Sequence, residues 1–248
     1  MDDSFIFLKD RRKGDLKIMA KLIGIFILLF TTKFLAGQET LFVDYSQIKQ
    51  NIESKKSEFY YPVLLERFNA FDSTLTSKDY MHIYYGFAYQ DAYLNMRPDE
   101  AILSELLESE NFEKLTTECE KILQVNPVSL KANDFLGYAL FETGKPEAEW
   151  QKYQNRYRAI RRAIASSGDG QSCETALKVI YVSDEYNMLY TYFDVEKIHS
   201  RRLVSQSGLC DYFEIEPTQY LQSKEVYFDI SVSLLRTQEL FDKKATVK

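Results

Sequence analysis

The chain has 248 residues, a net charge of −6 and 27% charged residues. Its 18 tyrosines, 17 phenylalanines and only five prolines are typical of an ordered globular protein and argue against a disordered chain. The acidic excess would repel phosphate backbones, so we expect no nucleic-acid partner. After residue 37, the basic residues cluster only at Arg156, Arg158, Arg161 and Arg162.

The first predicted element, over residues 1–37, is a secretory signal peptide. An uncharged apolar run over residues 22–30 follows Lys21 and leads to a short stretch of small residues. A basic residue, a short apolar run and a small-residue exit are typical of such a leader. The run is shorter than the roughly 20 residues that a membrane-spanning helix needs. We therefore predict cleavage near residues 36–38, an exported protein that is periplasmic or secreted, and no stable membrane span after cleavage.

The leader has two further features. Residues 1–18 are polar and mixed in charge, whereas Met19 opens an ordinary short basic segment, which favours a start at Met19 over a long basic segment. No cysteine follows the apolar run, which argues against a lipid anchor.

Residues 38–166 are predicted to be helical, because apolar residues recur there at helical spacing. Asp44 and Thr76 are placed to cap helices, and Asp79 completes a variant of the capping box after Thr76. Pro62 fits the first turn of another helix. Further helices are expected near residues 77–94, 98–108, 111–125, 129–142 and 146–165.

Residues 96–163 of this helical region resemble tetratricopeptide-type hairpins, whose repeating unit is a pair of helices. The resemblance is carried by residues at the pattern's positions, Phe112, Pro127, Leu136, Gly137, Gly144 and Tyr153. Gly137 would let two helices approach closely. The chain departs from the pattern at Leu115, Asn133 and Glu149.

Residues 171–248 are predicted to form a small antiparallel β-sheet and a C-terminal helix, packed together as one unit. The apolar run at residues 176–183 indicates a central strand, and the more polar residues 198–206 indicate an edge. Short connections favour antiparallel neighbours. The helix, over residues 231–243, is expected to cover one face of the sheet, so the fold class is α+β. The remaining strands are expected at residues 187–195, 209–216 and 225–230.

Several short segments together resemble one uncharacterised family of exported proteins, a domain of unknown function common in gut-dwelling Gram-negative bacteria. The segments are 42–45 (FVDY), 59–62 (FYYP), 84–87 (YYGF), 167–170 (SGDG) and 182–186 (VSDEY). The resemblance covers nearly all of the chain after the leader. It implies export and the order of helices before sheet, and it carries no established activity or catalytic residue.

His82 is the candidate general base, with Asp79 on an adjoining turn; the alternative, which we favour, is a partly buried histidine among tyrosines. Paired carboxylates are a second possible source of chemistry, as Glu66 with Asp72 or as Asp184 with Glu185. These groups define the alternative function, an envelope hydrolase acting on a glycan or a peptide. No cofactor or metal is expected, because the sequence has no P-loop, dinucleotide-binding motif or metal-spaced histidine cluster.

Aromatic residues are densest between residues 60 and 93, and at helical spacing they cannot all face one core. The candidate ligand-binding residues among them are Tyr60, Tyr61, Tyr84 and Tyr85. Because stacked helix pairs present a concave face, we expect a non-catalytic interaction module that binds an unidentified protein, peptide or glycan.

Three cysteines leave two alternatives open. An exported chain meets oxidising conditions, so Cys173 and Cys210 are a possible disulfide; the alternative, which we favour, is three buried free thiols. Between the two halves of the chain, Gly168 and Gly170 fit a sharp turn from helix to sheet, with Asp169 bonding its own backbone.

Overall fold

The computed structural model describes residues 41–95, 100–205 and 208–246. The predicted signal peptide over residues 1–37 and the predicted start at Met19 lie outside these residues. The described part is α+β, as predicted, with helices before a small sheet and a C-terminal helix.

Eight helices precede the sheet in the described part of the chain, in the order α1 (Tyr45–Glu53), α2 (Tyr61–Asn69), α3 (Ser77–Phe87), α4 (Asp91–Asn95), α5 (Ala101–Glu108), α6 (Phe112–Val125), α7 (Leu130–Glu142) and α8 (Glu147–Ala165). The predicted caps are confirmed: Asp44 accepts hydrogen bonds from the amides of two residues that follow it, and Thr76 forms a capping box with Asp79. Pro62 lies in the first turn of α2. The single helix expected near residues 77–94 is divided, because α3 ends at Phe87 and α4 begins at Asp91.

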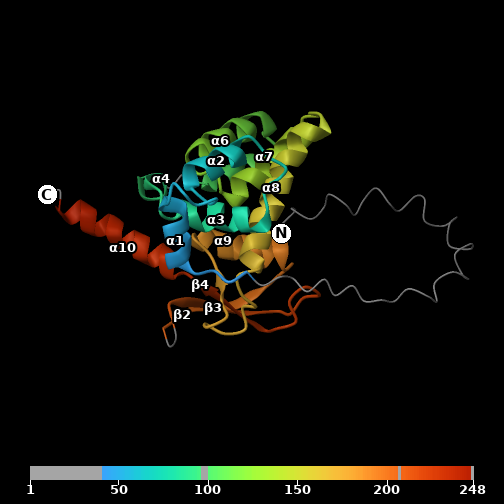
Figure 1. Ribbon diagram of the computed structural model, residues 1–248. Coiled ribbons are helices and arrows are strands. Elements are labelled where there is room, and N and C mark those ends of the chain that lie inside the picture. Colours follow the sequence, from blue (N-terminus) through green and yellow to red (C-terminus); the bar gives the residue numbers. More distant parts are fainter. Residues whose placement is uncertain (1–40, 96–99, 206–207, 247–248) are drawn as a thin grey trace, which may run out of the picture. The chain divides into compact units, whose positions relative to one another are not determined.

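Two hydrophobic clusters hold these helices. The larger one, here the main cluster, joins α1–α4, α8 and the sheet and includes Leu64, Tyr84 and Phe213. The smaller one, here the α5–α7 cluster, includes Leu103 and Leu136. In Figure 1 the strands lie at one end of the molecule, α6 and α7 lie at the other end, and α3 lies between them.

The sheet is mixed rather than antiparallel. Its strands are β1 (Leu177–Lys178), β2 (Ile198–Val204), β3 (Cys210–Ile215) and β4 (Glu225–Asp229), in the order β1-β4-β3-β2. β1 pairs with β4 in parallel, whereas β4 with β3 and β3 with β2 are antiparallel. The predicted edge position of β2 is confirmed.

The central strand predicted over residues 176–183 is wrong. Only Leu177–Lys178 is a strand, at an edge of the sheet, and α9 (Val182–Asn187) and a π-helix (Met188–Tyr192) follow, where a second strand was expected. Tyrosines of the helical half replace the missing strand partners: Tyr85 donates to the carbonyl of Lys178, and Tyr84 accepts from the amide of Ile180. These contacts satisfy the buried backbone without a second ladder, so the apolar run is buried but is not a strand.

α10 (Ser231–Thr246) closes the described chain. The expectation that it covers a sheet face is wrong, because its principal contact is with α4 and its Arg236 guanidinium lies 6.0 Å from the centre of the Tyr89 ring on the helical side. Figure 1 shows α10 extending outward beyond β4.

Candidate binding site

A groove of about 690 Å³ lies between the main cluster and the α5–α7 cluster. Residues of α2, α3, α4, α6, α7 and α8 and of the turns between them line it. The volume is in the range of sites that hold drug-sized ligands. The lining mixes aromatic, aliphatic, carboxamide and charged side chains, including Tyr61, Leu65, Phe71, Gln90, Leu123, Gln124, Tyr153 and Arg156.

Arg156 brings a buried positive charge to this groove. Its side chain is held between two aromatic rings, with the guanidinium carbon 3.9 Å from the centre of Phe68 and 3.8 Å from that of Phe71, and the residue is 5% exposed. Nη2 donates a hydrogen bond to the carbonyl of Phe68, near the C-terminus of α2. Burial lowers the pKa of Arg156 to about 10, so the group is still charged at neutral pH.

The backbone of Phe71 is strained in this arrangement. Its φ of 56° lies in the left-handed region, which a bulky side chain rarely adopts and which costs about 1–3 kcal/mol. In this conformation its ring packs edge-on against Tyr153, with ring centres 5.1 Å apart, and also covers the guanidinium of Arg156. The strain therefore falls at the groove.

The four tyrosines expected to bind a ligand do not come together. Tyr61 lines the groove, but Tyr60 is the half-buried residue before α2 and does not line it. Tyr84 and Tyr85 are fully buried and point their hydroxyls at Asp184 and at the backbone of residue 178. Their role in the structure is to tie α3 to β1 and to α9.

His82 has both ring nitrogens in hydrogen bonds. Nδ1 lies 2.8 Å from the carbonyl of Lys78, so it carries the proton, and Nε2 lies 3.0 Å from the side-chain amide of Asn51. Phe59 stacks on the ring at 3.8 Å, and burial lowers the pKa of His82. This neutral imidazole does not line the groove and offers no free nitrogen to a substrate.

The acidic pairs are also engaged elsewhere. Asp72 accepts from Arg67 and Thr74, and these hydrogen bonds hold its pKa at about 2, while Glu66 is exposed. Asp184 and Glu185 are buried, and burial raises the pKa of Asp184 to about 8 and that of Glu185 to about 9. None of the four lines the groove.

Glu185 belongs to a polar network on the sheet. Arg201 Nη2 lies 3.4 Å from Glu185 Oε2 and also pairs with Asp211 of β3. Glu185 is fully buried, and it shares Arg201 with the carboxylate of Asp211. The network holds α9 against β2 and β3.

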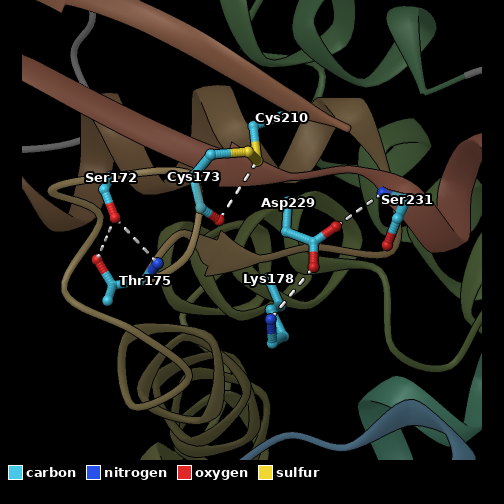
Figure 2. The surroundings of a disulfide bond; sticks show 7 residues. All are labelled: Ser172, Cys173, Thr175, Lys178, Cys210, Asp229 and Ser231. Carbon is cyan, nitrogen blue, oxygen red and sulfur yellow. Dashed lines mark hydrogen bonds and ion pairs between the residues drawn. A yellow bond between two sulfur atoms is a disulfide. The ribbon is translucent and has the colours of Figure 1, made fainter. Parts of the chain in front are cut away.

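The disulfide left open by the sequence is present: Cys173 and Cys210 are joined, with Cα atoms 5.8 Å apart (Figure 2). The favoured alternative of three free thiols is therefore wrong for these two, and only Cys119 is free and buried. The bond fastens the loop before β1 to the start of β3. Nearby, Lys178 of β1 and Asp229 of β4 form an ion pair at 3.2 Å, and Asp229 also accepts from the amide of Ser231 (Figure 2).

The structural glycines occupy distinct environments. A Cβ on Gly168 would lie 2.3 Å from the carbonyl oxygen of Thr175, so only glycine allows this close approach of the chain to itself. Gly144 and Gly170 have φ of 70° and 68°. In the same turn, Asp169 accepts from the amide of Gln171.

Among the residues that the structure describes, no three His, Cys, Asp or Glu side chains are grouped so as to hold a metal ion. Within the same residues, no helix combines the length and the apolar character needed to cross a membrane.

The fold and groove define an α+β protein with a cleft between two helical clusters. The chain belongs to the family of a domain of unknown function, DUF4919, which matches residues 46–239. No curated protein and no solved structure matches the chain.

Proposed function

We propose that this protein is a non-catalytic interaction module that binds an extended peptide segment of a partner protein in the groove between α2, α4 and α6. The observation that carries the proposal is the groove itself, because it is large, lies between two hydrophobic clusters and offers aromatic surface beside carboxamide groups. Aromatic side chains bury large areas at binding sites, and carboxamides can bond a peptide backbone.

The packing of α5 to α8 supports this interpretation. Each of these helices contacts the next one along the chain, as in stacked helical hairpins. We therefore keep the tetratricopeptide-like description of residues 96–163 as part of the proposal. The hydrolase alternative has less support, because His82 and the acidic pairs lie away from the groove and are bonded to other groups of the protein.

Blocking the groove tests the proposal. The probe is a displayed library of short random-sequence peptides, selected on the mature protein. Gln124 is exposed on α6 and lines the groove, whereas Lys121, also exposed on α6, does not. We expect Gln124→Trp to abolish binding of the selected peptides and Lys121→Trp to leave it unchanged. Equal binding by both variants, or no selected peptide at all, would contradict a peptide site in the groove.

We also propose that the protein is exported and cleaved near residues 36–38. The apolar run over residues 22–30 supports this, and so does the disulfide between Cys173 and Cys210, because such bonds persist mainly in oxidising compartments. N-terminal sequencing of the protein from its native host tests it. The expected result is a start near Gln38 in the periplasmic or secreted fraction, and an intact N-terminus in the cytoplasm would contradict export.

A further inference from the structure

Arg156 has donors to spare at the groove. A guanidinium offers five N–H donors, and the bond to the carbonyl of Phe68 uses one of its terminal nitrogens. Ion pairs join Arg67, Arg201 and Arg236 to carboxylates. In the described part of the chain no carboxylate forms an ion pair with Arg156. The other described arginines without an ion pair are exposed or half-buried, whereas Arg156 is buried; they are Arg158, Arg161, Arg162 and Arg202.

A buried charge without a counter-ion is costly, and buried charges are normally paired. The rings of Phe68 and Phe71 offset part of this cost through cation–π contacts. The C-terminal end of α2 offsets a further part, because its carbonyl groups carry partial negative charge. These contacts hold the guanidinium plane in place but neutralise no charge. The arrangement is a positioned cation that an incoming anion could pair with.

Two acidic side chains also line the groove. Asp91 of α4 and Glu120 of α6 both line it, and both are exposed. A ligand that is anionic throughout would meet repulsion from these carboxylates. A ligand with a carboxylate beside Arg156 and basic groups beside Asp91 and Glu120 matches the charges of all three side chains.

We propose that Arg156 anchors an Asp or Glu side chain of the bound peptide, and that Asp91 and Glu120 favour basic residues beside it. This inference rests on the proposed function and names its ligand class. A planar guanidinium suits this role because it pairs with a carboxylate through two parallel hydrogen bonds.

The test uses the displayed library with blocked C-termini, so that side chains supply the only carboxylates. We expect the selected peptides to share an acidic residue beside Lys or Arg. Replacing that residue by its amide, Glu→Gln or Asp→Asn, should weaken binding to the unchanged protein about tenfold or more. Arg156→Met should cause a similar loss, and the amide peptide should then lose nothing further, because the two changes remove the same contact.

Arg158 supplies the matched control, since it is exposed on the same helix and does not line the groove. Arg158→Met should bind the selected peptides as the wild type does. If Gln124→Trp abolishes binding of the selected peptides but the amide replacement leaves their binding unchanged, the proposed anchor at Arg156 is wrong and the proposed peptide groove is supported. If no peptide is selected, both proposals fail. The comparison of acidic and amide peptides uses the unchanged protein, so it tests the anchor even if Arg156→Met does not fold.

Discussion

Tyr84 on α3 donates a hydrogen bond through its hydroxyl to Oδ2 of Asp184 on α9, at 2.6 Å, and the same hydroxyl accepts from the amide of Ile180. Both side chains are buried, and 100 residues separate them in the sequence. One buried hydroxyl therefore bonds both a carboxyl oxygen of α9 and a backbone amide of the segment before it.

Tyr84→Phe should lower the free energy of unfolding by about 1–3 kcal/mol, because it leaves these two buried polar groups without that partner. Urea denaturation measures the change. Tyr80→Phe is the matched control: Tyr80 lies on the same helix, and its hydroxyl makes no hydrogen bond to any described residue. An equal effect of both substitutions would show that the hydroxyl of Tyr84 contributes nothing particular.

Stability should fall as pH rises, because of Glu185. Burial and the neighbouring Asp211 raise the pKa of Glu185 from 4.5 to about 9 in the folded protein. The folded state therefore holds a proton that the unfolded state releases, so this stabilising contribution is full below pH 4.5 and is lost as pH rises to about 9. Arg201 opposes the shift but is shared with Asp211.

Glu185→Gln removes the titrating group and nearly preserves the shape of the side chain. We expect the melting temperature of this variant to be close to that of the wild type at about pH 5 and to exceed it increasingly toward pH 9. Glu214→Gln, at an exposed position of β3, is the control and should follow the wild-type curve. Parallel curves for Glu185→Gln and wild type would mean that Glu185 is ionised in the folded protein.

The contrast between caps and strands shows what the sequence could predict. Asp44 and Thr76 could be identified as caps because a cap depends on residues within one turn. The run at residues 176–183 could not be assigned correctly, because an apolar segment of this length fits a buried strand or a buried helix equally well. Its true partners, Tyr84 and Tyr85, are about 90 residues earlier.

The groove was less predictable still. Its lining comes from six helices and the turns between them, so no local sequence pattern could predict it. The sequence shows Arg156 as a member of a basic cluster but gives no sign that it is buried between two phenylalanines, with no ion pair to a carboxylate of the described residues, whereas Arg158 is exposed. The difference in burial between Arg156 and Arg158 arises from tertiary packing.

Removing the disulfide should destabilise the protein measurably. The bond closes a loop with a sequence separation of 37 residues, and a loop of this size corresponds to about 2–4 kcal/mol in the unfolding free energy. We expect that loss in urea denaturation of a variant carrying both Cys173→Ser and Cys210→Ser. Reductant should lower the stability of the wild type toward that of the variant and leave the variant unchanged. A wild type indifferent to reductant at its unfolding midpoint would show that the bond does not form in solution.

Gly137 on α7 tests the packing of α7 against α8. A Cβ at this position would lie 2.7 Å from Nε2 and 2.9 Å from Cγ of Gln154 on α8, so any side chain must displace Gln154. Gln154 donates to both the backbone carbonyl and the carboxylate of Asp134, at 2.9 and 3.0 Å, and these bonds would be lost with the displacement. Gly137→Leu should therefore lower the free energy of unfolding by about 1–3 kcal/mol.

At an exposed helical position the same substitution would instead stabilise the protein, because glycine costs about 1 kcal/mol relative to alanine in a helix interior. The two outcomes differ in sign, so a thermal melt separates them. Truncating the obstructing side chain gives the matched control: Gln154→Ala in the Gly137→Leu background should recover part of the loss, since it clears the atoms that the leucine meets. A raised melting temperature for Gly137→Leu alone would contradict the close contact between α7 and α8, and with it the repeat-like stacking that supports a binding groove.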